Sequence, residues 1–171
     1  MRARSASRQR GSDDIYAAAA WPDVGFAVVS QERVREVDGL LASLRSWAAQ
    51  RTDVRALALV GSWARGQPTS ESDVDVVLLT DAPPRYINGE DWLASVGGVG
   101  LIKTQRWGVM TELRFALQSG LEVELGIGTP AWASVAPLDD GTRRVISDGM
   151  RAIHDPDGLL ARLAEACRTI T

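Results

Sequence analysis

Four residues in the first half of the chain have types and a spacing that suit phosphate and metal chemistry. Gly61 and Ser62 follow one apolar run, Asp73 and Asp75 begin a second, and ten residues separate Ser62 from Asp73. A glycine–serine turn that opens a helix can present backbone amides and a hydroxyl to phosphate oxygens. Carboxylates two residues apart on a strand leave it on the same side, where they can bind Mg²⁺. Together they suit a nucleoside triphosphate with its metal ion.

The two aspartates would repel each other in the folded chain. Because strand side chains alternate, Asp73 and Asp75 share one face, and Val74 and Val76 point into the core. Burying both charges without a cation costs free energy or raises the pKa of one carboxyl. A magnesium ion removes this cost, and two ions about 3.5–4 Å apart can stabilise both the attacking and the leaving oxygen of an in-line displacement. We therefore expect Asp73 and Asp75 to be metal ligands.

These segments resemble the signature of the nucleotidyltransferase superfamily, which includes DNA polymerase beta, the antibiotic nucleotidyltransferases and the small minimal nucleotidyltransferases. Residues 61–66 match the usual form Gly-Ser-x-Ala-Arg-Gly, and residues 70–75 contain the form Ser-Asp-x-Asp. The resemblance implies that Gly61 and Ser62 hold the β- and γ-phosphates. It also implies a nucleotidyltransferase fold, of the α/β (α+β) class, with Mg²⁺ as cofactor and a nucleoside triphosphate as donor substrate.

Members of this family usually carry a third acidic residue on a later strand, as a metal ligand, a general base or both. The segment at 120–127 offers Glu122 and Glu124 on one face of a predicted strand. The apolar–acid–apolar frame of the family fits Val123-Glu124-Leu125 best, so Glu124 is the expected catalytic carboxylate and metal ligand, with Glu122 as the alternative. Glutamate here departs from the commoner aspartate. The opposing interpretation of this pair is a solvated strand face.

Other polar and aromatic residues give weaker indications. Lys103 and Arg106, on one predicted strand, can neutralise triphosphate charge or simply be exposed to solvent. Arg65 is a predicted nucleotide-binding residue, but it can also pair with nearby carboxylates and stabilise the turn. Trp63 can stack on a base, although a packing role is expected. His154 is the one histidine of the chain, so an ordinary histidine-based metal site is excluded.

The pattern of apolar residues and turn formers predicts a mixed β-sheet packed against helices, not a doubly wound parallel sheet. Ser30 is the expected N-cap of the longest helix, and Asp157 or a neighbour that of the last helix. Strands are expected at 54–60, 73–80, 100–107, 112–117, 121–127 and 151–154. Helices or helical turns are expected at 15–21, 31–50, 62–65, 90–96, 142–147 and 158–168 and from Pro130.

Length and composition place further limits on the molecule. The 171 residues suit a disordered tail at 1–14 and a single nucleotidyltransferase domain at 15–171. The net charge of −3 and the pI near 5.2 argue against a nucleic-acid partner. The single cysteine, Cys167, excludes an internal disulfide and is expected in a buried helix face. Without an apolar run long enough for a membrane span or a secretory signal, a cytoplasmic protein is expected.

The resemblance implies transfer of a nucleoside monophosphate, with AMP expected, to a hydroxyl of a small molecule or a protein, and release of pyrophosphate. About 40 residues follow Ile127, fewer than the acceptor domain of the antibiotic-modifying relatives. Either a homodimer partner completes a small-molecule site, or the acceptor is a protein, as for the antitoxin-like minimal nucleotidyltransferases. The alternative from another class is a catalytically silent nucleotide-binding regulatory module.

Overall fold

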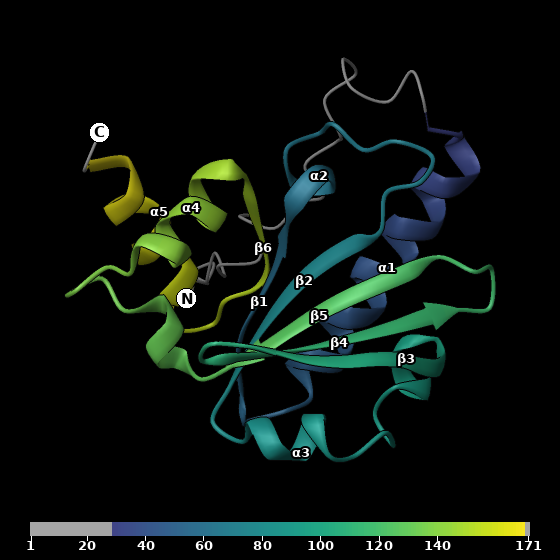
Figure 1. The fold of residues 1–171 in the computed structure, drawn as a ribbon, viewed down its shortest axis with the longest axis horizontal. Helices are drawn as coiled ribbons and strands as arrows, with labels where there is room; N and C mark the ends of the chain where they lie inside the picture. Colours follow the sequence, from purple (N-terminus) through teal and green to yellow (C-terminus); the bar gives the residue numbers. More distant parts are fainter. Residues whose placement is uncertain (1–28, 170–171) are drawn as a thin grey trace, which may run out of the picture.

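The computed structural model describes residues 29–169, with the arrangement drawn in Figure 1. The tail expected at 1–14 and the helical turn expected at 15–21 lie outside these residues. The strands are β1 (Val54–Val60), β2 (Val74–Thr80), β3 (Gly98–Trp107), β4 (Met110–Leu117), β5 (Glu122–Gly128) and β6 (Met150–His154). The helices are α1 (Gln31–Ala49), α2 (Gly61–Ala64), α3 (Pro83–Ile87), η2 (Ala94–Val96), η3 (Pro130–Ala133), α4 (Asp140–Asp148) and α5 (Leu159–Thr169). None of these helices combines the length and the apolar character of a membrane-spanning segment.

The six strands form one mixed sheet in the order β3-β4-β5-β2-β1-β6. The β2–β5 pair is parallel, and every other neighbouring pair is antiparallel. The predicted mixed sheet is thus confirmed, and each strand lies within two residues of its expected bounds. The central β1, β2 and β5 bring the Gly61 turn and the three acidic positions to one region of the sheet.

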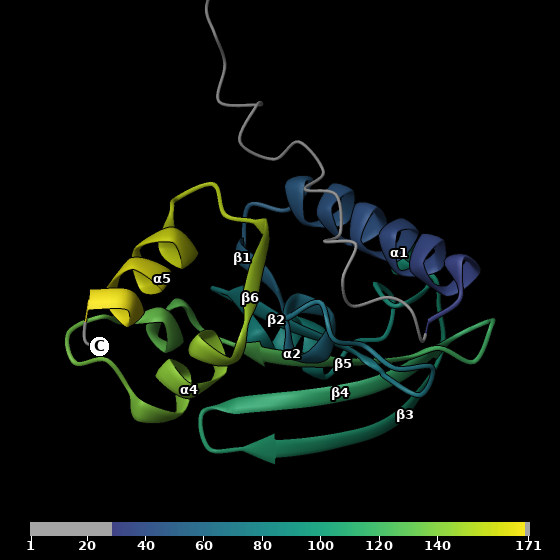
Figure 2. The same cartoon turned by 90° about the horizontal axis from the view of Figure 1, so that it is seen from above.

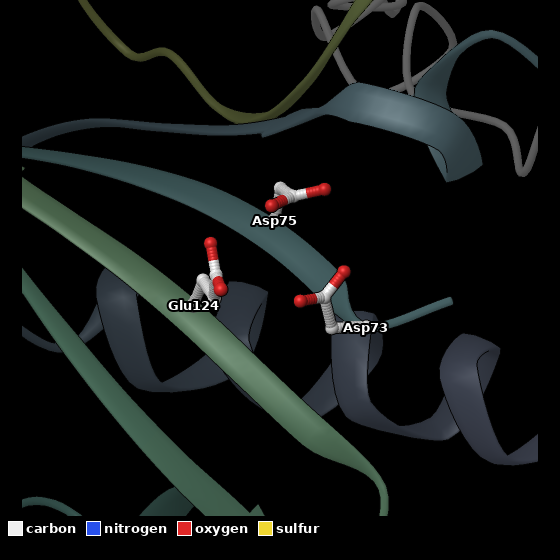
Figure 3. A group of neighbouring side chains, drawn as sticks. All are labelled: Asp73, Asp75 and Glu124. Atoms are coloured by element: carbon white, nitrogen blue, oxygen red, sulfur yellow. The ribbon is translucent and has the colours of Figure 1, made fainter. Parts of the chain in front are cut away.

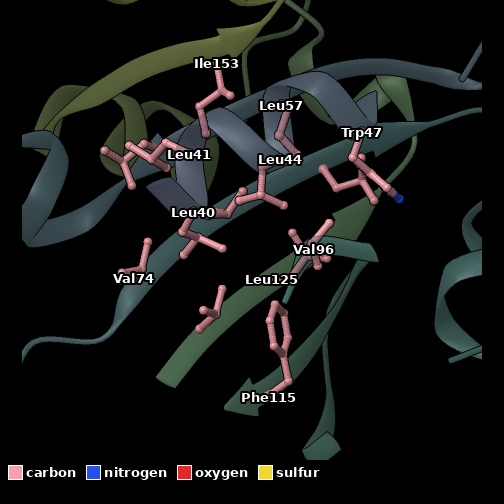
Figure 4. Close-up of a cluster of buried hydrophobic side chains, with 14 of the residues drawn as sticks. Leu40, Leu41, Leu44, Trp47, Leu57, Val74, Val96, Phe115, Leu125 and Ile153 are labelled. Atoms are coloured by element: carbon pink, nitrogen blue, oxygen red, sulfur yellow. The ribbon is translucent and has the colours of Figure 1, made fainter. Parts of the chain in front are cut away.

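Helix α1 packs across one face of the sheet and forms the larger core (Figure 4). Its N-terminus is capped as predicted, because the Ser30 hydroxyl accepts a hydrogen bond from the backbone N–H of Arg33. The apolar side of α1 meets the alternating inward residues of the strands. This core includes Leu40, Leu44, Trp47, Leu57, Val74, Val76, Phe115, Val123 and Leu125.

A second, smaller core lies on the other face of the sheet, under α4 and α5. It holds Ala56, Ala58, Val60, Val77, Leu79, Ile146, Leu160, Leu163 and Cys167. The cysteine is buried, as its helical setting predicted. Figure 2 shows α4 and α5 gathered at the β6 side, and β3 forms the opposite edge of the sheet. On this face the polar side chains of β4 and β5 stay partly exposed.

One local feature differs from the sequence prediction. No helix was predicted between the strand at 73–80 and the helical turn at 90–96, but Pro83 and Pro84 open the short helix α3. Proline is tolerated in the first helical turn because its missing N–H has no partner there, so the same residues end a strand and begin a helix. The helical turn predicted over 90–96 is present, as turns at 91–93 followed by the 3₁₀-helix η2 at Ala94–Val96.

Candidate active site

Three carboxylates converge where β2 and β5 run side by side. Asp75 and Glu124 are direct neighbours in the parallel β2–β5 register, and Asp73 immediately precedes β2. Figure 3 shows the three side chains gathered over these two strands. One oxygen from each lies within 4.8 Å of the other two, and all three residues are partly buried. Three carboxylates with room for water and phosphate oxygens are a donor set that fits Mg²⁺.

The structure distinguishes the two glutamates that the sequence left open. Glu124 belongs to the carboxylate group, whereas Glu122 lies two residues earlier on β5, outside that group. The Oε2 atom of Glu122 is instead 3.1 Å from Nη1 of Arg114. The hypothesis of a silent module would gain support if both glutamates faced away from the aspartates, and Glu124 does not.

Asp75 has the most perturbed environment in this group. Burial raises its pKa from the ordinary value of 3.8 to about 6, and the negative charges of Asp73 and Glu112 act in the same direction. The charges of Arg65 and Arg114 oppose this shift. A carboxyl with such a pKa is short of positive charge, which a bound divalent cation would supply.

The glycine–serine turn lies directly against these carboxylates. Val60, the last residue of β1, pairs with Asp75, and Gly61 then turns the chain with a φ of +68°. A Cβ atom at Gly61 would approach the Asp75 carboxylate, with its Cγ 2.9 Å away. Ser62 follows in the first turn of α2, where backbone amides lack helical partners. The structure therefore places the predicted phosphate-binding residues next to the predicted metal ligands.

Arg65 makes a contact that the sequence left open. One of its guanidinium nitrogens forms an ion pair with Asp148 at the end of α4. Gly149 packs closely here, because a Cβ at that position would lie 2.9 Å from the Arg65 Cγ. Arg65 thus connects the end of α2 to α4, which is the bracing role. Its role in nucleotide binding stays a prediction.

The two basic residues of β3 fall on opposite faces of the sheet. Lys103 pairs with Arg114, which pairs with Glu124, so Lys103 shares the face of the carboxylates. It is exposed and two strands from Glu124, or about 10 Å across the sheet. Arg106 pairs with Thr111 and leaves the other face. Only Lys103 of this pair shares the face of the three carboxylates, and its role in nucleotide binding stays a prediction.

The sequence analysis missed Arg114. This β4 residue forms an ion pair with Glu124, and its Nη2 atom is 3.9 Å from Asp73 Oδ2. A signal for it was present in the predicted hairpin. The turn at 119–120 between two alternating strands sets Arg114 opposite Glu124, as observed.

Two other features lie apart from the site. Trp63 is fully buried in the larger core, which confirms the packing role. A cavity of about 170 Å³ contains none of the three carboxylates. It is lined by Arg51, Arg85, Tyr86, Gly89, Asp91 and Trp92.

Part of the chain matches a known protein family. The family model described as a nucleotidyltransferase domain matches residues 41–125, about half of the chain. The match runs from α1 to β5 and therefore includes the Gly61 turn, both aspartates and Glu124. No curated protein matches the chain.

Solved structures give a partial likeness. The Cid1 poly(U) polymerase is 18% identical over 57% of this chain and 31% of its own, with a TM-score of 0.45. A cytoplasmic RNA terminal U-transferase is 20% identical over 57% and 30% of the two chains, with a TM-score of 0.45. An apo CCA-adding enzyme is 15% identical over 80% and 32%, with a TM-score of 0.37. The chain spans about a third of the length of these structures.

The domain match and the arrangement of the sheet agree. The glycine–serine turn, the paired aspartates and the third carboxylate lie within the matched residues, on adjacent strands. The chain belongs to the nucleotidyltransferase superfamily.

Proposed function

We propose that this chain is a metal-dependent nucleotidyltransferase that moves a nucleoside monophosphate from a nucleoside triphosphate to an acceptor hydroxyl. The observation that carries the proposal is the convergence of Asp73, Asp75 and Glu124 beside the Gly61 turn. The hydroxyl oxygen would form a bond to the α-phosphorus, the bond from that phosphorus to the bridging oxygen would break, and pyrophosphate would leave. Bound Mg²⁺ would neutralise the charge that develops on the phosphate oxygens.

Each protein group has a part in this reaction. Asp73, Asp75 and Glu124 would hold the metal, and Gly61 and Ser62 would bind the β- and γ-phosphates through backbone and hydroxyl donors. Glu124 would also accept the proton of the attacking hydroxyl, because its position on β5 is open to a substrate on this face. Most of the rate enhancement would come from positioning and charge neutralisation.

For the acceptor we propose a small molecule or a protein, with AMP as the transferred group. The support is electrostatic. The chain carries a net charge of −3, and Glu112 and Glu122 add negative charge around the three carboxylates. The phosphates of an RNA or DNA acceptor would be repelled there. A second copy of the chain or a protein substrate would complete the acceptor side.

The test is calorimetric titration of ATP, CTP, GTP and UTP with Mg²⁺ into the wild-type chain and into an Asp73→Asn/Asp75→Asn double variant. We expect metal-dependent binding of one nucleotide, ATP by this proposal, and its loss in the double variant. An Asp91→Asn variant, at an exposed position outside the site, serves as the matched control and is expected to bind as the wild type does. A folded wild-type chain that binds none of the four nucleotides would contradict the proposal.

A further inference from the structure

The guanidinium of Arg114 lies among the carboxylates that would hold the metal. It forms an ion pair with Glu124, its Nη1 is 3.1 Å from Glu122 Oε2, and its Nη2 is 3.9 Å from Asp73 Oδ2. The antiparallel β4–β5 register fixes this position, because Arg114 and Glu124 are direct partners. One cationic side chain thus faces two carboxylates of β5 and the carboxylate that immediately precedes β2.

Its position sets Arg114 in competition with a divalent ion. A divalent cation held by Asp73 and Glu124 would need oxygens of the same two carboxylates that face Nη2 of Arg114. Two positive charges a few ångströms apart repel each other, and arginine cannot lose its proton to relieve this. Glu122 offers Arg114 another acceptor away from the aspartates.

We propose that Arg114 is a built-in counter-cation that holds the carboxylates of the metal-free site together and weakens metal binding until nucleotide phosphates arrive. Arg114 is therefore a positioning residue that acts through Glu124 and Asp73. With a cation held by Asp73 and Glu124, Arg114 would keep its contact with Glu122, and Glu124 would be free to act as ligand and base. This inference rests on the proposed function, because it assumes that the three carboxylates bind a divalent cation.

The test measures the affinity of the nucleotide-free chain for Mn²⁺, from the electron paramagnetic resonance signal of the free ion. We expect Arg114→Gln to bind Mn²⁺ about tenfold more tightly than the wild type or better, because one nearby positive charge is lost. Arg114→Lys keeps the charge and is expected to bind about as weakly as the wild type. If circular dichroism shows that Arg114→Gln is unfolded, Arg114→Met, which fills the same half-buried space, replaces it.

Arg106→Gln is the matched control, since it removes an arginine from the same hairpin but from the opposite face. Its Mn²⁺ affinity is expected to equal that of the wild type. If the wild type binds Mn²⁺ and Asp73→Asn abolishes this binding, unchanged or weaker Mn²⁺ affinity in Arg114→Gln would overturn this inference alone. If no variant binds Mn²⁺ with or without nucleotide, both this inference and the proposed function fail.

Discussion

Asp75 is a site residue whose pKa is clearly raised by its surroundings. Its pKa is raised from 3.8 to about 6, first by burial and then by the charges of Asp73 and Glu112. The folded state thus favours the protonated carboxyl, whereas the unfolded chain ionises near the ordinary value. Folding stability from this group is present below about pH 4 and is lost as the pH rises through about 6.

The first prediction concerns Asp75→Asn, which removes this ionisation. Without metal, we expect the variant to unfold at higher urea concentration than the wild type at about pH 8, with at most about 2–3 kcal/mol gained. The difference should vanish near pH 4, where the wild-type carboxyl is protonated. Urea unfolding followed by circular dichroism across this pH range provides the measurement. A wild type that is more stable than the variant at about pH 8, or a variant that is still more stable at pH 4, would show that ionisation of Asp75 does not destabilise the folded state.

The second prediction concerns Gly61, whose backbone and surroundings both require a missing side chain. Gly61→Ala would place a Cβ against the Asp75 carboxylate, at a φ of +68° that costs other residues about 1–2 kcal/mol. We expect a loss of about 1–3 kcal/mol in stability and a clear fall in nucleotide affinity. Gly100→Ala, where an added Cβ meets nothing within 4 Å, is the control for each measurement. Equal nucleotide affinity in the two variants would argue against phosphate binding at this turn.

At the scale of elements, the pairing of the strands brings site residues together in a way that the sequence alone could not establish. Alternation of apolar and acidic residues predicted both β2 and β5 and the common face of Glu122 and Glu124. It could not decide that β5 pairs with β2 in parallel, since this contact joins residues far apart in sequence. That register selects Glu124 over Glu122. The local β4–β5 hairpin did contain the signal for Arg114.

The residue that caps the N-terminus of helix α5 also could not be assigned from the sequence alone. The sequence allowed Asp157 or a neighbour as its cap, and the structure selects Asp155, whose carboxylate accepts hydrogen bonds from the N–H groups of Leu160 and Ala161. Asp157 forms an ion pair with Arg55 instead, 2.6 Å away. The choice depends on the end of β6, which the local sequence pattern does not encode.

The third prediction compares these two aspartates. Asp155→Ala removes a buried cap and is expected to lower the free energy of unfolding by about 1–2 kcal/mol. Asp157→Ala removes one partner of an exposed ion pair and is expected to cost less than about 1 kcal/mol. Chemical denaturation of both variants at neutral pH measures the difference. A larger loss in Asp157→Ala would reverse the assignment of the cap.

In the whole molecule, the larger core and the candidate active site lie on opposite faces of the sheet. One face is covered by α1 and the larger core, while the other carries α4 and α5 at the β6 side and the partly exposed carboxylates toward β4. The sequence predicted this division through its motifs and alternating strands. It left open which face of the sheet Arg106 takes and missed α3, because strand register and proline context depend on the assembled sheet.

The central claim is that Asp73, Asp75 and Glu124 bind the metal beside a triphosphate at the Gly61 turn. A crystal of the chain with Mn²⁺ and a non-hydrolysable ATP analogue tests it most directly, because manganese is located by its anomalous scattering. We predict a peak about 2.1 Å from oxygens of the three carboxylates, with phosphates at Gly61 and Ser62. Bound nucleotide with manganese elsewhere, or with Arg114 still occupying this position, would contradict the account.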